Sequence, residues 1–152
     1  MEESEAVETA PLVLVDAANV VGSVPDGWWR DRRGAAERLR DALAAVARDG
    51  LAERTGAPEW SRTGPLELVL VVEGAARGVA SVPLVRADSA SGSGDDRIVD
   101  LVRAALAAHP DRNCLVVTAD RGLRDRVTAL GAEVVGPRAV RPAQPRPGGA
   151  PA

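Results

Sequence analysis

NCLVVTADRGLRDRVTALGAEVVG, residues 113–136, contains the pattern of a strand, a helix and a second strand. The run 113–120 is apolar and of strand length, 121–131 has helical character and ends at Gly131, and 132–136 is apolar again. Two neighbouring strands joined through a helix are parallel, and their connection is right-handed. This segment therefore predicts a parallel sheet.

The same alternation extends toward the N-terminus. PLVLVDA (11–17), LELVLVVEG (66–74) and the shorter VPLVRA (82–87) are typical of buried strands, while residues 31–50 and 95–109 have the three-and-four apolar spacing of helices. We expect a turn-rich loop at 19–29 and a surface connection at 50–65. The whole pattern predicts an α/β fold: a three-layer α/β/α sandwich around a mainly parallel, Rossmannoid sheet.

The length of 152 residues suits one domain. We assign it to residues 11–136, preceded by a flexible acidic leader (1–10) and followed by a disordered Pro-rich tail (137–152). No apolar run reaches the roughly 18 residues of a membrane span, and the N-terminus lacks the pattern of a secretion signal. We therefore expect a cytoplasmic protein that does not enter the membrane.

The composition excludes several kinds of chemistry. All 19 basic residues are Arg, so lysine Schiff bases and a phosphate-loop lysine are excluded. Cys114 and His109 are the single residues of their types, which excludes an internal disulfide and argues against a histidine triad. The net charge of −3 provides no general attraction for nucleic acid. Any catalysis must therefore rely on carboxylates.

Four aspartates are expected at one edge of the sheet. Asp16 ends the first strand, Asp120 ends the fourth, and Asp95 and Asp96 begin the helix after the loop SGSG (91–94). Ligands of open α/β sheets bind outside the carboxyl ends of the strands. Carboxylates this close repel one another unless a hard cation such as Mg²⁺ or Mn²⁺ lies between them. The pattern predicts a metal site that activates water for phosphodiester hydrolysis.

Each acid also has a structural interpretation. Asp95 or Asp120 taken alone caps a helix, and Asp16 alone ends a strand. Asp100 and Asp125 are explained equally well as solvated helix charges, and Glu73, which follows the second strand, is a weaker candidate. The coincidence of several acids on one predicted edge favours the functional interpretation.

Candidate substrate contacts are less specific. Asn19 is placed to orient Asp16 or a water, although Asn after a strand often forms a turn. Ser93, Arg121, Arg124 and Trp28 are candidates for binding an RNA backbone or base. Arg126 and Trp29 belong to the same two clusters, and solvated arginines or tryptophans at the edge of the core explain them equally well.

Three segments, VLVDAANVV (13–21), SGSGDDRIVDLV (91–102) and VVTADRGLRDRVTALGAEVV (116–135), resemble the NYN group of the PIN-like superfamily, in particular its YacP-like branch of predicted ribonucleases. The resemblance implies a metal-dependent nuclease acting on RNA. Asp16 would be the first-strand metal ligand with Asn19 as its companion, Asp96 with Asp95 the helix-start acids, Asp120 the acid after the fourth strand and Asp125 a further polar position. Relatives often have glycine after the first aspartate, where this chain has Ala17, and an aspartate in place of Glu73.

The resulting hypothesis is a ribonuclease with Mg²⁺ or Mn²⁺ held by Asp16, Asp96 and Asp120. A nucleotide pyrophosphohydrolase would use the same acids, and a non-catalytic RNA-binding module would use them only as helix caps. The sequence leaves open the RNA target, the number of metal ions and whether the protein forms a homo-oligomer.

Overall fold

The computed structural model describes residues 10–24, 27–52 and 56–140. Its strands are β1 (Leu12–Asp16), β2 (Glu67–Val72), β3 (Val85–Ser89), β4 (Cys114–Val117) and β5 (Glu133–Val135). Its α-helices are α2 (Ala17–Gly22), α3 (Arg32–Asp49), α4 (Gly94–Ala108) and α5 (Arg121–Ala129). The 3-10 turns are η1 (Trp28–Arg30), η3 (Glu59–Ser61), η4 (Gly74–Ala76) and η5 (Pro137–Ala139).

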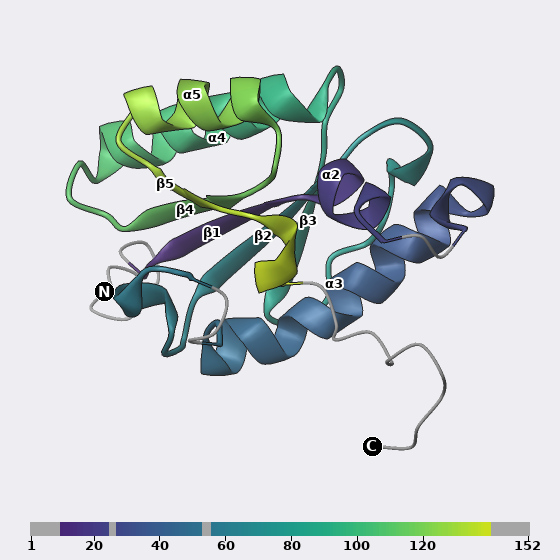
Figure 1. Ribbon diagram of the computed structural model, residues 1–152, viewed down its shortest axis with the longest axis horizontal. Coiled ribbons are helices and arrows are strands. Elements are labelled where there is room, and N and C mark those ends of the chain that lie inside the picture. The colour runs from purple at the N-terminus through teal and green to yellow at the C-terminus, as the bar shows by residue number, and fades with distance from the viewer. Residues whose placement is uncertain (1–9, 25–26, 53–55, 141–152) are drawn as a thin grey trace.

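The five strands form one sheet in the order β3-β2-β1-β4-β5 (Figure 1), and every neighbouring pair is parallel. β1 lies in the middle, paired with β2 on one side and β4 on the other. All residues of β1 and β4 are buried, which explains why their sequences are continuous apolar runs with no alternation. The predicted parallel α/β sheet is confirmed.

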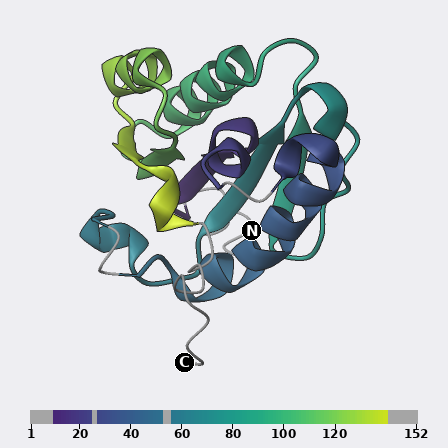
Figure 2. The same ribbon diagram turned by 45° about the vertical axis from the view of Figure 1, so that its right-hand side comes forward.

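Helices cover both faces of the sheet, α4 and α5 on one side and α2 and α3 on the other (Figures 1 and 2). Successive residues of β1 point to opposite faces. Val13 and Val15 accordingly pack in the core beneath α3, with Leu43, whereas Leu14 packs in the core beneath α4, with Ile98. The three-layer α/β/α sandwich is therefore confirmed, with an apolar core on each side of the sheet.

Some predicted boundaries are wrong in detail. The loop expected at 19–29 begins inside a helix, because α2 starts directly after β1 and its first turn is capped by Asp16. The third strand starts at Val85, three residues later than predicted. The connection expected on the surface at 50–65 carries the buried side chains of Leu51, Ala57 and Ser61.

The packed part of the domain extends beyond residue 136. Pro137, Ala139 and Val140 are buried, and the last two join the core beneath α3. These four residues, 137–140, therefore belong to the fold and not to a tail. The leader up to residue 9 and the segment 141–152 lie outside the described residues. Among the helices that are described, none is long and apolar enough to cross a membrane.

Candidate active site at the carboxyl edge of the sheet

Four acids meet where the order of the strands reverses. The chain passes from β1 outward to β2 and β3, then returns to the other side of β1 as β4, so the switch point lies between β1 and β4. Asp16 is the last residue of β1, Glu73 follows β2, Asp95 lies in the first turn of α4 and Asp120 caps α5. Asp16, Glu73, Asp95 and Asp120 are called the acid group below.

Asp16 is the buried member of the acid group. The residue is 4% exposed, and its carboxylate accepts hydrogen bonds from the hydroxyl of Thr118 at 3.0 Å and the backbone N–H of Asn19 at 3.4 Å. Burial raises the pKa of Asp16 from 3.8 to about 6, the two hydrogen bonds oppose that rise, and the charges of Asp95 and Glu73 add to it. The surroundings of Asp16 therefore favour its neutral form over the ionised carboxylate.

Asp95 is coupled to the same group. Burial raises the pKa of Asp95, and the charges of Asp120 and Glu73 raise it further, while Arg126 acts in the opposite direction. Asp95 and Glu73 thus disfavour the ionised form of Asp16, and Asp120 and Glu73 disfavour that of Asp95. Like charges gathered from four separate segments are a recognised mark of functional sites.

Glu73 explains one of the glycines before the acids. Its carboxylate accepts a hydrogen bond of 3.1 Å from the backbone N–H of Gly94, the first residue of α4. A Cβ at position 94 would lie 2.9 Å from a carboxylate oxygen of Glu73, so only glycine fits without displacing this acid. At Gly92 a Cβ would meet nothing within 4 Å, so of the two glycines in the loop 91–94 only Gly94 is required by a close contact.

Thr118 links the acids of β1 and β4. Its fully buried hydroxyl donates to Asp16 and accepts a hydrogen bond of 3.1 Å from the backbone N–H of Asp120. Asn19 adds a second link, because its side-chain oxygen accepts a hydrogen bond of 2.8 Å from the backbone N–H of Ala119. Thr118 was not predicted as a site residue, because its only signal in the sequence is a hydroxyl residue directly after a buried strand.

The donors of the acid group are carboxylate oxygens, the ligand type that Mg²⁺ and Mn²⁺ prefer. Across residues 10–24, 27–52 and 56–140, no three His, Cys, Asp or Glu side chains form a group that could by itself hold a metal ion. Mg²⁺ usually binds through one or two carboxylates and keeps several waters, so it does not need such a cage. The chemistry of the donor set fits a hydrated divalent ion.

Two of the predicted metal ligands have more exposed side chains than the acid group. Asp96 forms an ion pair of 3.0 Å with Arg126, and its side chain is 71% exposed. Its charge raises the pKa of Asp95, but less than the charges of Asp120 and Glu73 do. Asp125 is exposed on α5 and is not among the charges that shift the pKa of Asp16 or Asp95. We predicted Asp96 as the main helix-start acid with Asp95 beside it, and the structure couples Asp95 to the other acids.

The predicted substrate residues divide into structural and accessible ones. Ser93 caps α4 by accepting a hydrogen bond from the backbone N–H of Asp96, and Arg124 donates to the carbonyl of Thr118 at 2.8 Å. Both side chains therefore hold the local backbone. Arg121 is exposed at the start of α5, which leaves it accessible to a ligand.

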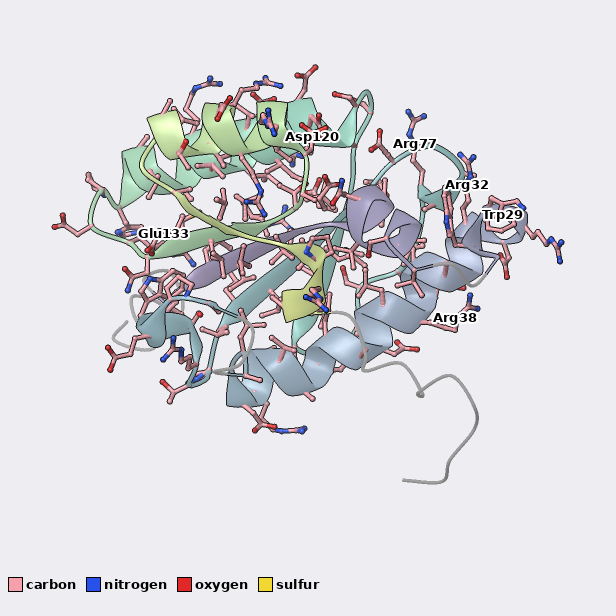
Figure 3. All side chains as sticks on the ribbon, in the orientation of Figure 1. Trp29, Arg32, Arg38, Arg77, Asp120 and Glu133 are labelled. Atoms are coloured by element: carbon pink, nitrogen blue, oxygen red, sulfur yellow. The ribbon has the colours of Figure 1, made fainter. Side chains whose placement is uncertain are left out.

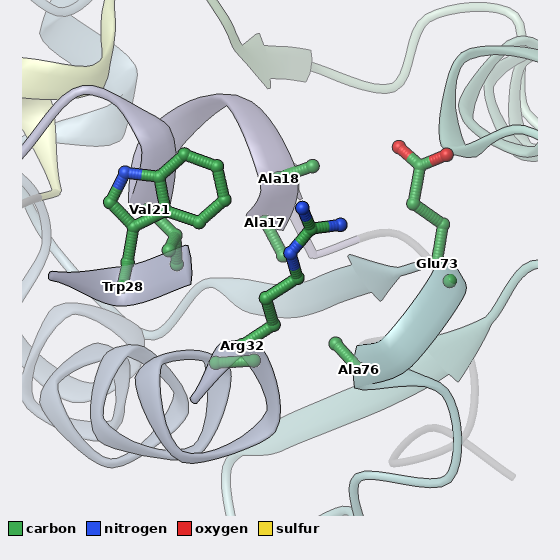
Figure 4. Close-up of a pocket in the computed structure, with 9 residues that line it drawn as sticks. Ala17, Ala18, Val21, Trp28, Arg32, Glu73 and Ala76 are labelled. Atoms are coloured by element: carbon green, nitrogen blue, oxygen red, sulfur yellow. The ribbon is translucent and has the colours of Figure 1, made fainter. Parts of the chain in front are cut away.

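A pocket of about 240 Å³ lies beside the acid group (Figure 4). Its walls are small apolar side chains of α2, α3 and η4, namely Ala17, Ala18, Val21, Ala36 and Ala76. The larger side chains that line it are Trp28, Arg32 and Glu73, and the guanidinium of Arg32 extends between the other two. The pocket thus shares Glu73 with the acid group, and Ala17 follows Asp16 directly.

A scan of protein-family models and a search of curated proteins give no match to this sequence. Among solved structures, Rae1 (YacP) from Bacillus subtilis has the same fold, with a TM-score of 0.63 and 18% sequence identity over 86% of this chain and 72% of that chain. At 18% sequence identity, this likeness shows a shared fold and nothing more specific. The resemblance to the YacP-like branch inferred from the three sequence segments is confirmed at that level.

Proposed function

We propose that this protein is a metal-dependent ribonuclease that hydrolyses RNA phosphodiester bonds at the acid group. The observation that carries the proposal is Asp16: a carboxylate almost fully buried at the switch point of the sheet, with its pKa raised to about 6 by burial and by neighbouring acids. A helix cap alone does not explain it, because a neutral Asn would cap α2 equally well without an ionised group in that environment.

In this proposal one or two of the carboxylates of Asp16, Asp95 and Asp120 would bind a hydrated divalent ion directly, and the others, with Glu73, would bind it through its waters. A bound Mg²⁺ or Mn²⁺ supplies a water of lowered pKa and stabilises the oxygen that leaves the phosphorus. The positive charge would also favour the ionised forms of Asp16 and Asp95, opposing the effects that now raise both pKa values.

The other residues of the edge hold these acids in position. The Thr118 hydroxyl restricts the carboxylate of Asp16, and the amide of Asn19 fixes the segment that leads from β4 to Asp120. Rigid support of this kind is what a site needs to act on a phosphate group. RNA as the substrate is supported by the three sequence segments that resemble the NYN group, and the likeness of fold to Rae1 (YacP) agrees with that resemblance.

The proposal is tested by degradation of a labelled single-stranded RNA with Mn²⁺, with Mg²⁺ and with EDTA. Asp16→Asn is the inactivating variant, and Asp125→Asn, which changes an exposed acid outside the group, is the matched control. We expect metal-dependent cleavage that falls at least 100-fold in Asp16→Asn and stays near wild type in Asp125→Asn. Equal activity in both variants would indicate a contaminating nuclease and contradict the proposal.

A second readout separates the alternatives. Mn²⁺ should raise the melting temperature of the wild-type protein and of Asp125→Asn, but not that of Asp16→Asn. Cleavage of free nucleotides in place of RNA would assign the acid group to a pyrophosphohydrolase. RNA binding without cleavage and without a Mn²⁺ effect would assign it to a binding module.

A further inference from the structure

The pocket beside the acid group has the composition of a base-binding site. Trp28 forms one wall, and its ring is approached by Arg32, whose guanidinium carbon lies 5.4 Å from the ring centroid. Single-stranded nucleic acids bind to proteins through aromatic rings on which bases stack and through arginines that contact them. The remaining walls are apolar, and an apolar surface with one or two polar groups suits a flat heteroaromatic ring.

The volume limits what can occupy this pocket. At about 240 Å³ it is smaller than the roughly 300–1,000 Å³ of pockets that enclose drug-sized ligands, and it is open on one side. One base fits such a space while its sugar and phosphates stay outside. A base in a duplex is stacked and paired, so it enters a pocket only after leaving the helix, whereas an unpaired strand offers its bases freely.

Arg32 lies between the Trp28 wall of the pocket and the acid group. Its guanidinium extends from the start of α3 between the ring of Trp28 and the carboxylate of Glu73 (Figure 4). A strand with a base on Trp28 must carry its phosphate past Arg32 to reach the acid group. The phosphate would otherwise approach Glu73 and Asp16 with like charge, and Arg32 provides the opposite charge at that point.

Neighbouring arginines are engaged elsewhere. Arg33 donates to the carbonyls of Arg77 and Gly78, and Arg77 donates to the carbonyl of Ser91. Within the part of the chain that the structure describes, the guanidinium of Arg32 contacts the ring of Trp28 but forms no hydrogen bond or ion pair with a side chain or backbone group. It can therefore donate to a ligand without breaking a hydrogen bond or ion pair of the fold, at the cost of at most its contact with the Trp28 ring.

We propose that this pocket seats one unpaired base of the RNA strand on Trp28, with Arg32 binding the adjoining phosphate, so that the protein acts on single-stranded RNA. This inference rests on the proposed function, since it names the substrate form that reaches the acid group.

The test measures binding and cleavage separately. Binding of a fluorescently labelled six-residue single-stranded RNA is measured by anisotropy in EDTA, where cleavage is not expected. The variants are Trp28→Ala, Trp28→Phe and Arg32→Ala. Trp29→Ala removes the adjacent tryptophan, which is 55% exposed and does not line the pocket, and Arg38→Ala removes an exposed arginine from the same helix as Arg32 (Figure 3). These two are the matched controls.

We expect Trp28→Ala to weaken binding roughly 5- to 150-fold, the loss of one base stack, with Phe recovering most of it. Arg32→Ala should weaken binding about 5- to 10-fold and reduce its dependence on salt. Both controls should stay within about twofold of wild type. Trp28→Ala binding equal to Trp29→Ala, or duplex RNA binding as tightly as the single strand, would overturn the inference.

A second variant covers the case in which Trp28→Ala fails to fold. Ala18→Leu enlarges an exposed side chain that lines the pocket, and it should block the base without altering the core. Wild-type affinity in Ala18→Leu with an unchanged melting temperature would overturn the inference. A free mononucleotide that binds as tightly as the six-nucleotide RNA would show that the pocket does not select RNA, and would also overturn the inference.

The outcomes distinguish this inference from the proposed function. If Trp28→Ala and Arg32→Ala bind and cleave RNA as well as their control variants do, the proposed nuclease function is supported and the base pocket is contradicted. If neither the wild type nor any variant cleaves RNA, but Trp28→Ala still loses single-strand binding, the nuclease function is contradicted and the base pocket is supported.

Discussion

The hydroxyl of Thr118 donates a hydrogen bond of 3.0 Å to the carboxylate of Asp16, and so connects the ends of the central strand β1 and its neighbour β4. The same hydroxyl accepts from the backbone N–H of Asp120. One buried oxygen therefore positions two members of the acid group.

Replacing this hydroxyl tests its role. Thr118→Val should destabilise the protein by about 1–3 kcal/mol, because a buried carboxylate and a backbone N–H lose a partner. It should also raise the pKa of Asp16, since the hydrogen bond from Thr118 lowers it. Thr118→Ser keeps the hydroxyl and is the control. Urea unfolding at pH 7 measures the difference, and equal stability of the two variants would contradict this role.

Asp16 should make the metal-free protein less stable at neutral pH. Its pKa of about 6 in the folded state lies above the ordinary value of 3.8, so the folded state binds the proton more tightly than the unfolded chain. The stabilisation from that proton is complete below pH 3.8 and is lost as the pH rises through 6. The shift corresponds to roughly 3 kcal/mol.

Asp16→Asn should therefore be more stable than wild type at pH 7 in EDTA, by up to about 3 kcal/mol, with the difference decreasing toward pH 4. Its amide oxygen can still accept from Thr118. Denaturant unfolding at several pH values measures the effect. A constant difference across this range would show that the ionisation of Asp16 is not its source.

The neighbours Asp95 and Asp96 should behave differently. Asp95→Asn should reduce any Mn²⁺-dependent activity at least 10-fold, because Asp95 is coupled to Asp120 and Glu73. It should also reduce the rise in melting temperature that Mn²⁺ causes. Asp96→Asn should lose the exposed ion pair with Arg126, which is worth about 0–1 kcal/mol, and remove a minor one of the charges that raise the pKa of Asp95, with little effect on activity. If Asp96→Asn is instead the less active of the two variants, Asp96 is the metal ligand, as predicted from the sequence.

Gly94 and Glu73 should show strong coupling in a double-mutant cycle. The Cβ of Gly94→Ala would lie 2.9 Å from a carboxylate oxygen of Glu73, so the acid must move and its hydrogen bond to residue 94 is strained or lost. We expect Gly94→Ala to reduce Mn²⁺-dependent activity in the wild-type background but to have no effect in Glu73→Ala. Activity is measured for the two single variants and the double variant. Additive effects would mean that residue 94 acts by another route.

Much of this fold could be predicted from the sequence. Strands buried on both faces are apolar throughout, and β1, β2 and β4 are visible for that reason. The helix α2 was missed because it has only six residues, too few to display a helical period. The packing of Val140 was missed because burial by a distant part of the chain leaves no local pattern.

The candidate site was predicted in outline, and its detail depends on side-chain direction. A signal for Asp95 was present: it lies three residues before Ile98 and four before Val99, both buried, so it shares the inward face of α4. Asp96 is rotated away from that face. The contribution of Thr118 depends on the pairing of β1 with β4, which the sequence alone does not specify.

Each half of the chain contributes two members of the acid group. Asp16 and Glu73 come from the half that builds β1, β2 and β3, whereas Asp95 and Asp120 come from the half that builds α4 through β5. The site is therefore assembled by the junction of the halves along β1 and β4. Two fragments separated in the loop before α4 would each carry two of the four acids, and only their reassociation could restore the set.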